Sequence, residues 1–249
     1  MSSKVKREKK SRANNNNNEK INLQLQNIEP LSDTQEKLFE QYNEYPHLFL
    51  HGYAGTGKSF LALYLGFLEL LKPESTYKKI TIVRSAVPTR DIAFLPGSAR
   101  DKIRHYEQPY IAIVNQLFNH SNAYEIMKSK GRIEFISTSF IRGTTIDDTI
   151  FIIDEAQNTS FHELNSVITR VGVNTKLIVC ADIAQTEDSV GRAASGIVAF
   201  SHIVDNMKEH FANIAFTVDD IVRSEFVRDW IIASNQYFDD RNSTSKNTP

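Results

Sequence analysis

The chain has 249 residues, with 29 basic and 30 acidic side chains and a formal net charge of −1, and this length suits one large domain or two small ones. The single cysteine, Cys180, excludes an intrachain disulfide and nearly excludes a cysteine-based zinc site. Because no run approaches the ~18 apolar residues of a membrane span and the N-terminus has no apolar stretch typical of a secretory signal, we expect a cytoplasmic protein.

The first segment, residues 1–20, is a basic and asparagine-rich arm. It carries seven basic and two acidic side chains and includes the run from Asn14 to Asn18. Too few of its side chains are apolar to offset the entropy lost on ordering, so we expect disorder. Such an arm either holds phosphates loosely through counterion release or is a solvated tail without a specific role. The near-zero overall charge therefore hides an uneven distribution and does not exclude nucleic acid as a partner.

Beyond the arm, short apolar runs alternate with longer helical segments. The runs are rich in Ile, Val, Leu and Phe with little alternation, which is typical of strands buried on both faces of a parallel sheet. They predict strands at residues 47–51, 80–83, 133–136, 149–153, 176–180 and 214–218. Helices are predicted at residues 35–42, 58–71, 108–130, 161–171, 195–208 and 225–237. This alternation predicts an α/β fold with a doubly wound, mainly parallel sheet, in one domain over residues 31–240 followed by a polar tail over residues 241–249.

The first predicted strand runs into a glycine-rich turn and then an apolar helix. The turn and the first apolar residue of the helix read Gly52-Tyr53-Ala54-Gly55-Thr56-Gly57-Lys58-Ser59-Phe60. This fits the G-x-x-x-x-G-K-[ST] pattern of a P-loop, whose backbone N–H groups cradle nucleotide phosphates. Glycines let phosphate approach the main chain, Lys58 meets the β- and γ-phosphates, and the Ser59 hydroxyl binds Mg²⁺. The alternative is a glycine-rich turn without a ligand, but the flanking strand and helix favour ATP and Mg²⁺.

Acidic residues follow two other predicted strands. Asp154 and Glu155 come directly after the fourth strand, and Asp182 comes shortly after the fifth. Because ligands gather at the carboxyl ends of strands in open α/β sheets, we assign Asp154 to the metal ion and Glu155 to orienting the attacking water. Surface charges without a role are the alternative. We expect Asp182 and Gln185 beside the same pocket, with Gln185 sensing the γ-phosphate, unless Asp182 caps the next turn.

Eight segments occur together in a characteristic order. They are LSDTQ at 31–35, GYAGTGKS at 52–59, VRSAV at 83–87, FLPG at 94–97, IRGTT at 141–145, FIIDEAQN at 151–158, ADIAQ at 181–185 and DIVR at 220–223. Together they resemble the PhoH-like family, the phosphate-starvation-inducible ATPases, in its short single-domain form common in phages. The resemblance covers residues 31–237. Ala181 stands where the family usually has Gly, and Ser85 where it usually has Pro, which affects only fine geometry.

The resemblance implies a RecA-like core similar to the first one of superfamily-one helicases. In that core, the strand ending at Asp182 lies between the P-loop strand and the strand ending at Asp154. The resemblance also implies that Gln35 reads the adenine edge, with an ordinary surface position on a helix as the alternative. Ring-shaped homo-oligomers acting on RNA, with a hexamer suspected, are implied as well. Some longer relatives carry a PIN nuclease domain, for which this chain has no spare length, so RNA cleavage is not expected.

Residues 78–108 form the densest basic segment of the predicted domain, with seven basic and three acidic side chains. Phe94 and Tyr106 within it can stack on bases while the cations follow the backbone. Its turn-forming residues predict that much of it is a loop: Pro88, Pro96, Gly97 and Pro109. We expect it to contact RNA or single-stranded nucleic acid; a solvated loop or a contact between subunits is the alternative. The candidate contact residues are Arg84, Arg90, Arg100, Lys102 and Arg104.

Arg223 follows the sixth predicted strand. Its setting, Val222-Arg223-Ser224, resembles the helicase motif whose arginine touches the γ-phosphate, where an arginine contributes about 10³–10⁵ in rate. It acts either within its own subunit or across an interface, and an ordinary salt bridge is the alternative. Arg142 is a weaker candidate for sensing the nucleotide or contacting nucleic acid.

Together these features predict a Mg²⁺-dependent ATPase whose hydrolysis moves residues 78–108, coupled to RNA or single-stranded nucleic acid in an oligomer. Two alternatives stay open. A small-molecule P-loop kinase would need an acceptor-binding lid and usually lacks the second acid, and an ATP-dependent assembly or interaction module would show little turnover. The short form and the asparagine- and lysine-rich composition suggest a phage origin, which would place the protein in the host cytoplasm.

Overall fold

The computed structural model describes residues 23–85, 99–138, 141, 143, 145–182 and 194–245. Within these residues the strands form one six-stranded sheet of order β3-β2-β4-β5-β1-β6, in which every pairing is parallel. No helix in this part of the chain is both long and apolar enough to cross a membrane. Several predictions lie outside the described residues, namely those for the arm at 1–20, Arg90, Arg142 and Gln185.

All six predicted strands are present, each slightly longer than or shifted from its predicted range. They are β1 (His47–Gly52), β2 (Lys79–Arg84), β3 (Ile133–Ser137), β4 (Thr149–Asp154), β5 (Thr175–Asp182) and β6 (Phe211–Phe216). Every residue of β4 is buried, which explains why its sequence lacks alternation. The predicted order is confirmed, because β5 lies between β1 and β4.

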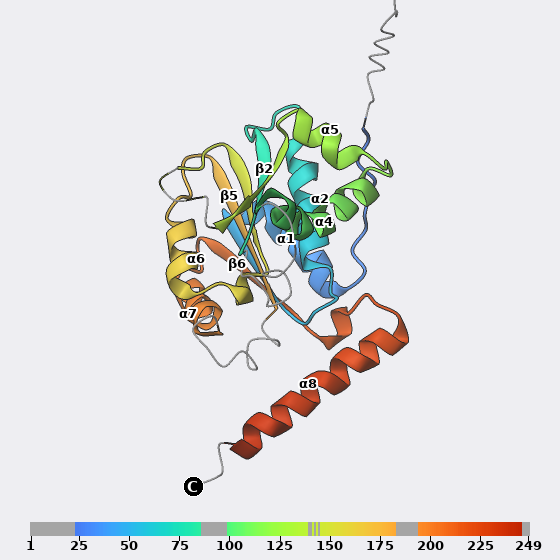
Figure 1. Cartoon of the computed structure of the whole chain (residues 1–249), viewed down its shortest axis with the longest axis vertical. Coiled ribbons are helices and arrows are strands. Elements are labelled where there is room, and N and C mark those ends of the chain that lie inside the picture. The colour runs from blue at the N-terminus through green and yellow to red at the C-terminus, as the bar shows by residue number, and fades with distance from the viewer. Residues whose placement is uncertain are drawn as a thin grey trace, which may run out of the picture.

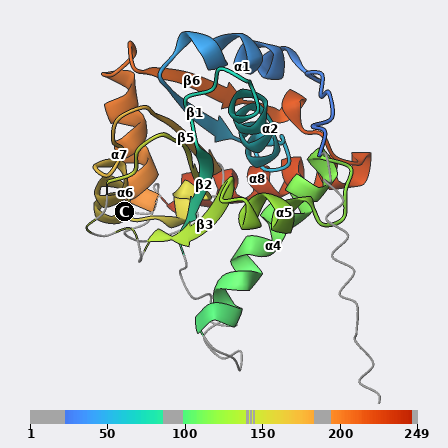
Figure 2. The same cartoon turned by 90° about the horizontal axis from the view of Figure 1, so that it is seen from above.

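Helices cover both faces of the sheet (Figures 1 and 2). One face packs against α1 (Asp33–Glu44), α2 (Lys58–Leu70), α4 (Ala99–Leu117) and α5 (Ala123–Ser129), and the other against α6 (Phe161–Ile168) and α7 (Ala194–Asp205). Leu48 and Leu50 belong to the first core and Phe49 to the second, as expected when successive side chains of a strand point to opposite faces. The doubly wound α/β architecture is therefore confirmed.

Two short 3₁₀ helices and one long helix complete the described structure. The 3₁₀ helices are η2 (Ala156–Asn158), directly after β4, and η3 (Val218–Asp220), directly after β6. The long helix α8 (Glu225–Ser245) extends past its predicted end at residue 237. It passes below the carboxyl edge of the sheet and projects beyond the rest of the domain (Figure 1).

The prediction of a single helix over residues 108–130 was wrong. The segment contains the end of α4 and all of α5, and Asn119 between them has a left-handed backbone with φ 46°, which ends a helix. Of the loop predicted within residues 78–108, residues 86–98 lie outside the described part; the end of that segment is helical instead, because α4 begins at Ala99 and contains Pro109. Proline removes a backbone hydrogen bond to the carbonyl four residues earlier, here that of His105; His105 is exposed, so water can satisfy this carbonyl.

Ser32 and Asp220 join the start of α1 to the end of η3. The Ser32 hydroxyl accepts a hydrogen bond from the Gln35 N–H and donates one of 2.6 Å to Asp220 Oδ1. The other Asp220 oxygen accepts the Thr217 N–H at 2.7 Å. Burial opposes the charge of Asp220, but the hydrogen bonds from Ser32, Thr34 and Thr217 outweigh it, so the pKa of this carboxyl is lowered. This link holds the segment after β6 against α1, beside the glycine-rich loop.

Candidate nucleotide-binding site

The loop between β1 and α2 takes a backbone path that requires glycine. Gly52, Gly55 and Gly57 have φ values of 126°, 77° and 86°, a region that side chains with a Cβ rarely adopt. A Cβ on Gly52 would lie 1.9 Å from the Phe216 carbonyl oxygen of β6. Gly57 is the N-cap residue of α2 and offers no side-chain hydrogen bond, so the first N–H groups of α2 keep their capacity to bind an anion.

Lys58, the first residue of α2, curls back over the loop. Its Nζ donates hydrogen bonds to the Tyr53 carbonyl at 2.5 Å, to Thr56 Oγ1 at 3.3 Å and to the Gly52 carbonyl at 3.4 Å. Burial lowers the pKa of Lys58, and the nearby negative charges of Asp182, Asp154 and Glu155 partly oppose this effect. The lysine therefore sits within the loop, as the P-loop pattern predicts.

Asp154, the last residue of β4, is held on both of its oxygens. Ser59 Oγ donates to Oδ1 at 2.8 Å, and the Tyr110 hydroxyl of α4 donates to Oδ2 at 2.8 Å. Asp154 is 5% exposed and Tyr110 is 2% exposed. Burial, together with the charge of Asp154, raises the pKa of Tyr110 well above its usual value, which keeps its hydroxyl a donor.

The oxygens of Ser59 and Asp154 fit a magnesium ion. Hard oxygen ligands suit Mg²⁺, which usually takes one or two protein groups and completes its shell with phosphates and water. Among the described residues, no group of three His, Cys, Asp or Glu side chains could hold a metal ion, so a metal here would depend on the nucleotide for further ligands.

Glu155 follows β4 with a left-handed backbone, φ 53° and ψ 39°. Gln157 Nε2 donates to Glu155 Oε2 at 2.7 Å, and Asn158 Nδ2 does so at 3.4 Å. Burial raises the pKa of Glu155, as does the charge of Asp154, while Arg84 and the Gln157 hydrogen bond lower it less strongly. A carboxyl with a raised pKa beside a phosphate-binding loop is suited to accepting a proton.

Gln157 also connects two strands. Its Oε1 accepts the backbone N–H of Asp182 at 3.0 Å, so one amide bridges the ends of β4 and β5. Asp182 is 6% exposed and lines the same cavity as the loop, as predicted. Whether Asp182 also caps a following turn concerns residues after 182, which lie outside the described part, as does Gln185.

Gln35 is buried on the inner side of α1, at 3% exposure, so the alternative of an ordinary surface position was wrong. Its Oε1 accepts the Leu31 N–H at 2.9 Å, and its Nε2 donates to the Thr56 carbonyl at 3.5 Å. The amide thus links the segment before α1 to the glycine-rich loop. Leu31 and Gln35 both line the same cavity as Asp154.

Arg223 lies beside the loop of its own chain. The Val222 N–H donates to the Gly55 carbonyl at 3.0 Å, and a Cβ on Gly55 would lie 3.0 Å from Arg223 Cγ. Arg223 is exposed and lines the cavity. In the described part of the chain it makes no ion pair within 4 Å, so the salt-bridge alternative finds no partner there.

These groups face one cavity of about 870 Å³ at the carboxyl edge of the sheet, within the range of small-molecule sites. The side chains predicted from the sequence to act at the site and found to line it are Gln35, Lys58, Ser59, Asp154, Glu155, Asp182 and Arg223. They come from positions 35 to 223, and parallel strands bring them together because the carboxyl ends of such strands share one edge.

The basic segment is divided in the structure. Arg84 ends β2 opposite Asp154 and is half-buried, with its guanidinium 5.5 Å from the centre of the Tyr106 ring. Arg104 is exposed on α4, whose N-terminal half points away from the sheet (Figure 2). For Arg100 and Lys102 the structure describes the backbone alone. Arg84 therefore lies beside the nucleotide-site carboxylates, whereas Arg104 lies on the projecting helix.

Sequence reasoning missed Tyr110 and assigned no role to Gln157. The only available signal for Gln157 was its place in the run after β4, two residues from Glu155. No sequence pattern marks Tyr110, because its partner Asp154 is 44 positions away.

The geometry defines the class of protein. A glycine-rich loop from the end of an interior parallel strand, with Lys58 inside it and Ser59 hydrogen-bonded to the acid of another strand, is the arrangement of a P-loop NTPase. The model of the family described as "PhoH-like protein" matches residues 27–235. The chain therefore belongs to the PhoH-like family, a family of the P-loop NTPase type.

Curated relatives agree with this assignment. The chain is 38% identical to "Protein PhoH2" of Bacillus subtilis over 146 residues. These aligned residues make up 57% of this chain and 33% of that protein. It is 30% identical over 212 residues to a "PhoH-like protein" of Mycobacterium tuberculosis, covering 84% of this chain and 58% of that protein. A "PhoH-like protein" of Synechocystis is 35% identical over 140 residues, covering 56% and 42%. The chain thus spans less than two thirds of the length of these relatives.

Proposed function

We propose that the chain binds ATP with Mg²⁺ and hydrolyses it. The observation that carries this proposal is the meeting of Lys58, the Ser59–Asp154 pair and Glu155 in one cavity. A phosphate-binding loop alone would support binding, whereas a second, proton-accepting carboxylate supports hydrolysis.

In the proposed mechanism, the residues of the site act on the phosphates, the metal ion and the attacking water. The loop N–H groups of residues 52–60 hold the phosphates, and Lys58 exchanges its carbonyl partners for the β- and γ-phosphates. Ser59 and Asp154 would hold Mg²⁺, which would supply positive charge to neutralise the phosphates. Glu155 orients the attacking water and accepts its proton. Arg223 offers a cation to the γ-phosphate from the same chain, and Gln185 senses that phosphate.

Gln35 is proposed to lie at the base end of the nucleotide. Its burial, its hydrogen bonds to the Leu31 N–H and the Thr56 carbonyl, and its place in the cavity lining support this. An amide offers one donor and one acceptor group, which matches the adenine edge.

We further propose that RNA or single-stranded nucleic acid binds near the projecting half of α4. Arg104 is exposed there, and Arg100 and Lys102 belong to the same helix. Arg84 lies at the end of β2, and Arg90, outside the described residues, is a further candidate contact from the sequence. Cations along a projecting element can follow a phosphate backbone, and such binding weakens steeply with salt.

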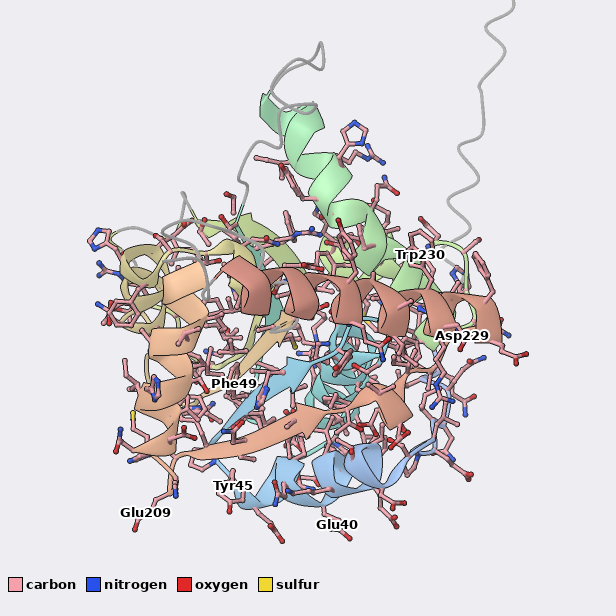
Figure 3. The ribbon with its side chains drawn as sticks, turned by 90° about the horizontal axis from the view of Figure 1, so that it is seen from below. Glu40, Tyr45, Phe49, Glu209, Asp229 and Trp230 are labelled. Carbon is pink, nitrogen blue, oxygen red and sulfur yellow. The ribbon has the colours of Figure 1, made fainter. Side chains whose placement is uncertain are left out.

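We also propose a homo-oligomer in which α8 forms a contact between chains; the hexameric ring is what the family resemblance implies. Phe226, Trp230 and Tyr237 are 75%, 67% and 57% exposed, and their spacing places them on one side of the helix. Large apolar side chains gathered on one face are typical of a surface that another chain covers. Trp230 and its neighbour Asp229 can be located on α8 in Figure 3.

Phosphate release at steady state tests the ATPase. Glu155→Gln should lower turnover by about 100-fold or more while nucleotide binding persists, and Lys58→Ala should weaken binding itself. Glu209→Gln, an exposed acid just before β6, is the matched control. Undiminished hydrolysis in both site variants would refute the assignment, and binding without turnover in the unaltered chain would favour an assembly module.

The partner proposals have separate tests. Stimulation of hydrolysis by RNA and by single-stranded DNA is measured over a range of salt; no stimulation and no binding would remove the nucleic-acid proposal alone. For assembly, sedimentation of Trp230→Ser is compared with Asp229→Ser. If only the Trp230 variant sediments as a smaller species than the unaltered chain, the α8 contact is supported. If the unaltered chain is itself a monomer, the contact is excluded.

A further inference from the structure

The two oxygens of Asp154 are held by different parts of the fold. Oδ1 accepts the Ser59 hydroxyl and Oδ2 accepts the Tyr110 hydroxyl, each at 2.8 Å. Ser59 stands at the start of α2, directly after the loop, and Tyr110 belongs to α4. The Ser59 side of the carboxylate is the side that faces the loop, so the Tyr110 bond fixes which oxygen is turned toward a metal ion.

Tyr110 is itself firmly placed. It is among the largest fully enclosed side chains, and Val114 and Leu117 on the same face of α4 are also buried, both at 0% exposure. The Leu117 carbonyl accepts the Gln26 N–H at 2.8 Å. Ile113 and Gln116 of α4 line the cavity. The helix that carries the tyrosine is therefore anchored along the nucleotide site.

We propose that Tyr110 is a positioning residue that holds Asp154 in the orientation required for Mg²⁺. The proposal rests on the proposed function, because it concerns the same metal. Hydrogen-bond partners of a metal-binding carboxylate fix its orientation, and their loss typically costs 10–100-fold in metal affinity. While the Tyr110 hydroxyl donates to Oδ2, the carboxylate is held with Oδ1 turned toward the metal position. Without this hydroxyl, the carboxylate can rotate.

The test is the Mg²⁺ dependence of nucleotide binding. Fluorescent ADP is bound to the full chain at increasing Mg²⁺, for the unaltered chain and for Tyr110→Phe. We expect the variant to need at least about tenfold more Mg²⁺ for half-maximal tightening, while its affinity for the nucleotide with Mg²⁺ chelated stays within twofold. In turnover, the Mg²⁺ requirement should rise by the same factor, and kcat should recover at saturating Mg²⁺.

Tyr124→Phe is the matched control. Tyr124 is also fully buried and donates from its hydroxyl to a carboxylate, Glu107, at 2.5 Å, but neither residue lines the cavity. Tyr124→Phe should leave the Mg²⁺ dependence unchanged even if it lowers the melting temperature. An unchanged Mg²⁺ requirement in Tyr110→Phe, or an equal shift in Tyr124→Phe, would overturn the positioning role.

The two proposals fail in different ways. If the unaltered chain shows no Mg²⁺-dependent nucleotide binding, the proposed function fails, and the inference on Tyr110 with it. If the unaltered chain shows that dependence and Tyr110→Phe matches it, only the inference fails.

Discussion

Ser59 donates a 2.8 Å hydrogen bond to Asp154 across 95 positions of sequence. Ser59 lies in α2, which follows β1, and Asp154 ends β4; the two strands are not neighbours, because β5 lies between them. The contact is possible because the loop after β1 carries the start of α2 over the end of β5. A serine hydroxyl and a carboxylate thereby meet above the sheet edge, where a metal ion can contact both.

The backbone of Gly52 predicts a large cost for any side chain there. Gly52→Ala would place a Cβ 1.9 Å from the Phe216 carbonyl oxygen at φ +126°, so we expect a loss of about 3 kcal/mol in unfolding free energy. Gly131→Ala is the control, since φ is +65° and nothing lies within 4 Å; it should cost about 1 kcal/mol. Urea unfolding followed by circular dichroism measures both. Equal losses would show that strain in φ, and not the close approach of β6, governs this position.

The buried Lys176 predicts a pH dependence of stability. It is 7% exposed, its Nζ donates to the Tyr45 carbonyl at 2.7 Å, and burial lowers its pKa to about 8, opposed weakly by Glu69. Between pH 8 and the unfolded pKa near 10.4, the unfolded chain binds the proton more readily. The contribution of Lys176 to the free energy of unfolding therefore rises with pH across that window, by at most about 3 kcal/mol.

Lys176→Met removes that rise. The free energies of unfolding of the two chains are measured from pH 7 to 10, and their difference isolates Lys176 from tyrosines that titrate in the same range. The difference should be constant below pH 8 and move in favour of the unaltered chain above it. A difference that stays flat throughout would mean that the lysine keeps its ordinary pKa in the fold.

The bond between Gln157 and Glu155 predicts a shift in the pH profile of hydrolysis. Burial and Asp154 raise the pKa of Glu155, so a proton-accepting role requires the acid limb of turnover to lie above the ordinary range of a glutamate. Gln157→Leu removes a donor that favours the carboxylate, which should move this limb to higher pH. Asn158→Ala removes the longer 3.4 Å contact and should move it little. If the acid limb of turnover lies at the same pH in the unaltered chain and in both variants, the result would argue against Glu155 as the proton acceptor.

The buried amide of Gln35 predicts a preference for adenine over guanine in the bound nucleotide. Gln35→Ala should weaken ATP binding about tenfold, on the order of 1.4 kcal/mol, and GTP binding less, if its amide reads the adenine edge. Lys37→Ala, an exposed position two residues on, is the control. Equal weakening of ATP and GTP would instead assign Gln35 to holding Leu31 against the loop. Titration with both fluorescent nucleotides distinguishes the two results.

The sheet and the loop could be predicted because their signals are local. Strands buried on both faces leave continuous apolar runs, and the phosphate-binding turn needs glycines at fixed spacing. The acids were predictable because they follow such runs directly, as Asp154 follows Ile153. The order of β4, β5 and β1 came from resemblance, since the runs alone do not reveal which strands are neighbours.

The region around α4 could not be predicted in the same way. Pro109 is usually a sign of a helix end, yet α4 continues through it because its exposed face lets water satisfy the freed carbonyl. Tyr110 has no sequence signal, because the partner of its hydroxyl is defined only when α4 packs over β4. Gln185 and Arg90 lie outside the described residues and stay predictions.

The backbone of Glu155 has one further consequence. At φ 53°, a glycine would be about 1 kcal/mol more stable than a residue with a Cβ, and an asparagine would also tolerate the conformation better. Neither offers a carboxylate. The backbone therefore disfavours glutamate at this position, and random substitutions selected for heat resistance alone should tend to replace it, at the expense of the role proposed for its carboxylate.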